Sequence, residues 1–109
     1  MADHNSMTQL MKTLADPTRR AVFEAIAQRG EVTVGTLVSG SGVSQPAVSQ
    51  HLRALKTAGL VAERRAGRHI HYRPDPRGLA PLIDWLGFYG AFWRERFDNL
   101  AELLKRMDS

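Results

Sequence analysis

Several chemistries are closed to this chain by what its sequence lacks. The 109 residues include no cysteine, which excludes disulfide bonds, thiolate metal sites and cysteine nucleophiles. The chain has no glycine-rich phosphate loop and no nucleophile, base and acid that the sequence brings together, so we expect no catalytic residues and no enzyme. No apolar run reaches membrane-spanning length, and the first residues lack a signal-peptide pattern. We therefore expect a cytoplasmic protein without a membrane partner.

The remaining composition is that of an ordinary folded domain with an uneven charge. Hydrophobic residues make up 43% and charged residues 24%, which predicts a single domain over residues 1–109. Residues 44–77 hold seven lysines and arginines against two acids, whereas the rest of the chain holds eight bases and nine acids. The formal net charge of +4 therefore comes from this one segment. A localised basic patch indicates a polyanionic partner such as double-stranded DNA.

Residues 44–57 carry the signals of a helix with defined ends. Ser44 can cap the helix by accepting a hydrogen bond from the backbone N–H of Ala47. Pro46 suits the first turn, where its missing N–H costs nothing, and Gly59 suits a left-handed residue after the C-terminus. The local sequence therefore predicts both boundaries of this helix.

The two faces of that helix differ in chemistry. Apolar residues recur at i, i+4 and i+7 and predict a buried stripe of Val48, Leu52 and Leu55. The opposite side is made of amide, hydroxyl and basic groups from Gln45, Ser49, Gln50, Arg53, Lys56 and Thr57. Glutamine can pair bidentately with adenine and arginine with guanine in a major groove, so this face is suited to reading base edges.

A β-hairpin is predicted directly after the helix. Residues 60–65 pair with residues 68–73 across Ala66 and Gly67, where Gly67 can adopt positive φ. Ile70 and Tyr72 are expected to pack inward, and the other face is expected to carry only cations and imidazoles. Such a hairpin would present its basic side chains to water or phosphate.

Two other interpretations remain open for this region. The helix could be an ordinary amphipathic surface helix and the bases a solvated charge run, although this does not explain why the charge is confined to helix and hairpin. The module could also bind a protein through the outer face of the helix, with the basic hairpin incidental. Salt-dependent binding to a DNA palindrome would discriminate between these possibilities.

The upstream residues predict the rest of a helix-turn-helix. A first helix is expected over residues 7–14, and a second runs from Asp16 and Pro17 to just before Gly30. Residues 31–32 form an extended link, Thr33 caps a short third helix, and residues 40–42 form the loop before Ser44. The expected fold is mainly α with a β-hairpin wing. It is a winged helix-turn-helix of about five helices and a short antiparallel sheet, with a reading head over about residues 33–73.

The C-terminal segment concentrates aromatic residues. Six of the eight aromatics lie within thirteen residues: Trp85, Phe88, Tyr89, Phe92, Trp93 and Phe97. Helical spacing predicts one stripe for the protomer's own core, containing Leu79, Leu82, Ile83, Leu86, Tyr89, Trp93, Leu100, Leu104 and Met107. A second stripe of Trp85, Phe88 and Phe92 needs an outside partner, and a second copy of the chain is the expected one. Gly87 and Gly90 are explained by close backbone approach, by a ligand cavity or by a break in the helix. Helices at about 7–14 and 79–107 are therefore expected to dimerise, through Met7, Leu10, Met11, Trp85, Phe88 and Phe92.

Four motifs together resemble the ArsR/SmtB family of bacterial winged-helix repressors. They are LADPTRR at 14–20, VSQPAVSQHL at 43–52, AGLV at 58–61 and GRHIHY at 67–72, within a resemblance that covers about residues 7–75. The resemblance implies a homodimer that binds an operator palindrome, represses transcription and is released by an inducer, either a small molecule or a protein. It also implies that the groove is contacted by Gln45, Ser49, Gln50, His51 and Arg53. With the wing, the candidate DNA-binding residues are Ser44, Gln45, Pro46, Ser49, Gln50, His51, Arg53, Arg64, Arg65, Arg68, His69 and His71.

The chain departs from the family's metal sensors. Those members carry Cys-Val-Cys at the start of the third helix, where this chain has Thr33 and Gly35. A second type of sensor uses Asp and His ligands on the last helix, yet residues 79–107 contain no histidine. His69 and His71 could supply at most half of a coordination shell. We therefore expect no metal and no cofactor.

Overall fold

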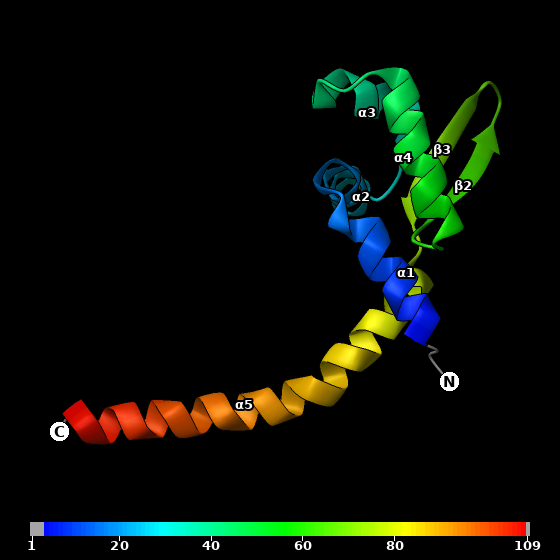
Figure 1. Ribbon diagram of the computed structural model, residues 1–109. Helices are drawn as coiled ribbons and strands as arrows, with labels where there is room; N and C mark the ends of the chain where they lie inside the picture. The colour runs from blue at the N-terminus through cyan, green and yellow to red at the C-terminus, as the bar shows by residue number, and fades with distance from the viewer. Residues whose placement is uncertain (1–3, 109) are drawn as a thin grey trace.

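The computed structural model describes residues 4–108 and shows a helical body with a β-wing and one projecting helix (Figure 1). The elements are α1 (His4–Ala15), α2 (Pro17–Arg29), β1 (Val32–Thr33), α3 (Val34–Ser41), α4 (Gln45–Thr57), β2 (Val61–Ala66), β3 (His69–Pro74), the 3₁₀ turn η1 (Pro76–Leu79) and α5 (Ala80–Asp108). This order confirms the predicted winged helix-turn-helix.

The predicted helix caps are present. The carboxylate of Asp16 accepts the N–H of Arg19 at 2.9 Å, and the hydroxyl of Ser44 accepts that of Ala47 at 3.3 Å. The Thr33 hydroxyl caps α3 in the same way. The predicted loop at 40–42 is wrong in part, because the last two residues of α3 are Gly40 and Ser41. Only Gly42 there is left-handed, and it ends the helix.

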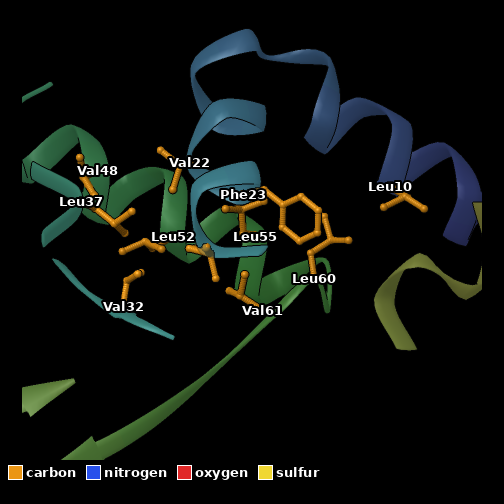
Figure 2. Packing of buried hydrophobic residues seen from close by; sticks show 11 residues of the cluster. Leu10, Val22, Phe23, Val32, Leu37, Val48, Leu52, Leu55, Leu60 and Val61 are labelled. Carbon is orange, nitrogen blue, oxygen red and sulfur yellow. The ribbon is translucent and has the colours of Figure 1, made fainter. Parts of the chain in front are cut away.

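The core lies between α1, α2, α3, α4 and the start of the sheet (Figure 2). The predicted stripe of Val48, Leu52 and Leu55 is fully buried. Full burial of a side chain of this size contributes about 1.5–3 kcal/mol. The other buried apolar residues are Leu10, Val22, Phe23, Ile26, Val32, Leu37, Leu60 and Val61. Core packing thus fixes the back of α4 and leaves its polar face outside.

The wing is part of a three-stranded antiparallel sheet in the order β1-β3-β2. Ala66 pairs with His69, so the hairpin turn is Gly67–Arg68 and not the predicted Ala66–Gly67. The difference of one residue arises because Gly67, at φ 63°, takes the first position of the turn. Arg68 therefore lies at the tip of the wing.

Helix α5 leaves the body as one continuous helix of 29 residues (Figure 1). The molecule consequently extends 64 Å along its longest axis. The predicted core stripe is wrong beyond its start, since Leu79 and Leu82 pack on the core but no residue of α5 is buried. The suggested helix break at Gly87 and Gly90 is also wrong, because the helix runs through both. None of the described helices combines the length and apolar character needed to cross a membrane.

Candidate nucleic-acid interface

The polar face of α4 is accessible to a partner. Gln45, Pro46, Gln50 and Arg53 are exposed, and Ser49 is half-buried. The preceding cap residue Ser44 is also exposed, although its hydroxyl is engaged by the helix N-terminus. These residues form a short, largely polar surface that runs from the N-terminus of α4 past its middle, and a recognition helix contacts base edges with its N-terminal residues.

Two side chains of α4 are less available than the sequence indicates. His51 is half-buried, and its Nδ1 has no hydrogen-bond partner among the described residues. The ring lies close enough to Asp16 to help lower the pKa of that carboxyl, after the larger effect of the Arg19 backbone N–H. The Thr57 hydroxyl donates to the carbonyl of Arg53 at 2.9 Å. His51 therefore faces α2 rather than the polar surface of α4.

A charged contact links the wing to α4. The Lys56 Nζ donates to the Glu63 carboxylate on β2 at 2.5 Å. This hydrogen bond holds the pKa of Glu63 below its usual value. Burial, and then the Glu63 carboxylate, raise the pKa of Tyr72 on β3. Lys56 is thereby engaged within the protein, beside the reading face.

Glu31, which sequence reasoning missed, occupies the wing face predicted to carry only cations and imidazoles. Its Oε1 accepts from Arg64 Nε at 3.0 Å and Nη2 at 2.8 Å, and lies 3.8 Å from His71 Nδ1. That prediction is therefore wrong for the root of the wing. Glu31 and Arg64 are 33 residues apart, so only the pairing of β1 with β3 brings them together.

The outer part of the wing carries basic side chains that form no ion pair within the described residues. Arg65, Arg68 and His69 are exposed and make no hydrogen bond or ion pair with another described residue. Arg64 is the wing arginine that is already held by a carboxylate. Within residues 4–108, no group of three or more His, Cys, Asp or Glu side chains is placed to hold a metal ion.

The candidate dimer residues separate into two groups. Leu10 is only 2% exposed and belongs to the protomer's own core, so its assignment to an interface is wrong. Met7 is half-buried and Met11 is exposed on α1. Trp85, Phe88 and Phe92 are 40%, 76% and 47% exposed on α5. Their ring contacts are with Tyr89 and Trp93 of the same helix, as in the Trp85–Tyr89 pair at 5.1 Å.

Comparison with known proteins gives consistent results. Residues 14–64 match a family model described as a helix-turn-helix domain. The chain is 43% identical over 104 residues to the HTH-type transcriptional regulator Rv2034 of Mycobacterium tuberculosis, covering 95% of this chain and 94% of the relative. It is 40% identical over 79 residues to the arsenical resistance operon repressor of Escherichia coli, covering 70% and 68%. A solution structure from Mycobacterium bovis superposes with a TM-score of 0.64 at 29% identity, covering 80% of each chain. It is described as the homodimeric winged helix-turn-helix DNA-binding domain of a possible ArsR-family regulator.

Proposed function

Because this chain belongs to the ArsR family of winged-helix transcriptional regulators, we propose that it is a repressor that binds an operator palindrome as a homodimer. The observation that carries the proposal is the contact between α4 and the wing. The shared core places a helix with an exposed polar face directly beside a hairpin with exposed arginines, and the Lys56–Glu63 pair links the two. Such an arrangement presents base-reading and phosphate-binding groups together.

In the proposed complex, each α4 enters a major groove. Gln50 and Arg53 contact base edges, while Gln45 and Ser49 contact bases or phosphates nearby. The two α4 helices occupy successive grooves roughly 34 Å apart, which is one helical turn of the duplex. The wing places Arg65 and Arg68 against the flanking backbone or minor groove. Repression follows because the bound dimer blocks the access of polymerase to the promoter.

In the proposed complex, one domain, residues 1–109, carries out both DNA binding and dimerisation. The reading head comprises about residues 33–73, and helices α1 and α5 join two copies. The body supports this division because core packing orients α4 and the sheet, whereas α5 projects beyond the core. The homodimeric description of the Mycobacterium bovis domain supports the same assembly.

The test is to recover the preferred DNA from a random pool and then to titrate it with salt. We expect the recovered fragments to share a palindrome, and log K to fall linearly with log salt concentration with a slope of about −0.9 for each phosphate contact. A protein that recovers no common sequence and shows no salt-dependent binding would contradict the proposal. Binding of a partner protein without DNA would then favour the protein-interaction module.

A further inference from the structure

A second basic surface lies beside α4, on the side formed by α1 and α2. A cleft of about 670 Å³ is lined by residues of these three helices. It contains one cation from each helix, Lys12, Arg19 and Arg53, and no carboxylate lines it. The other lining residues are alanines or neutral polar residues. The sequence patterns that identify α4 and the wing do not include Lys12 or Arg19.

Arg19 is fixed in position beside the cleft by the end of α1. Its Nη1 donates to the carbonyl of Thr13 at 3.5 Å, and the neighbouring Arg20 Nη1 donates to that of Leu14 at 2.7 Å. These bonds satisfy carbonyls that the end of α1 would otherwise leave unpaired. The Arg19 Nε is buried and has no hydrogen-bond partner among the described residues. Asp16 accepts the backbone N–H of Arg19 and also interacts electrostatically with the Arg19 side chain, although the two form no salt bridge.

Lys12, unlike Arg19, is not held in position by contacts with its neighbours. It is exposed and forms no hydrogen bond or ion pair with another described residue. Gln9 and Lys12 are three residues apart and share one flank of α1, whereas Met7 and Met11 are four apart and share another. The first flank lines the cleft, and the second carries candidate dimer contacts. Helix α1 can therefore bind an anion through one flank and contact a second copy of the chain through the other.

We propose that this cleft seats a backbone phosphate of the operator, with Lys12 as its principal contact. Gln50 and Arg53 belong both to the cleft lining and to the proposed reading face, so a strand passing along α4 would also pass Lys12. Figure 1 shows α1 beside the last turns of α4, as this path requires. The inference rests on the proposed function and extends the DNA surface from α4 and the wing onto α1.

The experiment measures salt-dependent binding of Lys12→Ala to the selected operator and to unrelated duplex DNA. One lost phosphate contact lowers affinity about fivefold at 0.15 M salt and reduces the slope by about 0.9. Because a dimer loses two contacts, we expect about a thirtyfold loss on both DNAs and a slope smaller by about 1.8. Lys12→Gln, which keeps much of the side-chain stem, should behave alike, and Lys12→Arg should restore the native slope. Arg29→Ala, which removes one positive charge from the exposed C-terminal end of α2, outside the cleft, should bind as the native chain does.

Three results would separate this inference from alternatives. Sedimentation and melting of each variant must match the native chain, so that altered folding or assembly is detected. If Lys12→Ala and Lys12→Gln bind with native affinity and slope while the native chain binds its operator, the proposed phosphate contact is wrong and the proposed function stands. A loss of affinity with an unchanged slope would likewise overturn the phosphate contact. If the native chain shows no salt-dependent binding at all, the proposed function itself fails.

Discussion

Gly78 is the residue at which the backbone entering α5 passes closest to the end of α4. A Cβ at this position would lie 2.6 Å from the carbonyl carbon of Gly59 and 2.9 Å from the Cα of Leu60. Gly59 has a φ of 78°, which favours glycine there as well. The Asp75 N–H donates to the Leu60 carbonyl at 2.9 Å and closes the two backbones on each other. Two glycines thus set how the projecting helix leaves the reading head.

We predict that Gly78→Ala lowers the free energy of unfolding by about 1–3 kcal/mol, the usual cost of overpacking. Urea denaturation would measure this change. Gly40→Ala is the control, because a Cβ there meets no atom within 4 Å and the residue is helical. It should stabilise the chain by about 0.5–1 kcal/mol. Equal effects of the two substitutions would show that the close approach at Gly78 has no energetic consequence.

Gln50 separates direct reading from positioning at the level of one side chain. It is exposed on the polar face of α4 and carries no charge. We predict that Gln50→Ala weakens operator binding by about 1–3 kcal/mol, relaxes the preference at particular base pairs and leaves the salt slope unchanged. Binding to a panel of single-base operator variants would measure this. Gln28→Ala is the control, since it removes the same side chain from an exposed position on α2, outside the reading face and the cleft. Uniform weakening on every DNA would make Gln50 a positioning contact.

Among the elements, the wing has one arginine that is already paired with a carboxylate and is therefore less available to a phosphate. Glu31 holds Arg64 through two nitrogen atoms, at 3.0 and 2.8 Å, at the root of the hairpin. Exposed ion pairs contribute little to stability, so the pair can be broken without unfolding the wing. Its main effect is on the number of cations that are free to meet phosphate.

We predict that Glu31→Gln strengthens DNA binding and raises the salt slope by about 0.9 per protomer, because Arg64 gains a phosphate partner. A salt titration measures both quantities. Glu24→Gln makes the same change of charge at another exposed position and should have little effect on the slope. The gain should also disappear in the double variant Glu31→Gln, Arg64→Ala. A gain that persists in that variant would assign the effect to overall charge.

The elements also show which features a sequence can predict. Asp16, Thr33 and Ser44 act within three residues of themselves, so their caps follow from local spacing. The hairpin exists as predicted. Its register depends on whether Gly67 takes the first or the second position of the turn, and these two alternatives differ by one residue. The Glu31–Arg64 pair joins positions 33 residues apart and has no local signal. The cleft at Lys12 depends likewise on the packing of α1 against α2 and α4.

At the scale of the whole molecule, the unusual feature is a helix whose apolar residues beyond Leu82 are not buried by any other described element. Helical spacing indicates one stripe for the core and one for a partner, yet beyond Leu82 both stripes lie outside the body. Exposed apolar patches of this extent mark interaction surfaces. In the proposed dimer, α5 of the second copy covers them, and the rigid path from α5 through Gly78 to α4 fixes the spacing between the two reading heads. Operator affinity should therefore depend on residues that do not contact DNA.

We predict that the double variant Trp85→Ala, Phe92→Ala shifts the protein toward monomer in analytical ultracentrifugation and weakens operator binding. Each buried aromatic contributes about 1.5–3 kcal/mol, and twofold symmetry counts each residue twice. The loss should be larger on the full palindrome than on a half-site, because a monomer still reads one half with its own α4. Ile26→Val is the control: it removes one methylene from the core and lowers stability by about 0.5–1.5 kcal/mol, but should leave the dimer mass unchanged. A double variant that stays folded, dimeric and fully competent for the palindrome would show that these rings are not the interface, and that the spacing of the reading heads is set elsewhere.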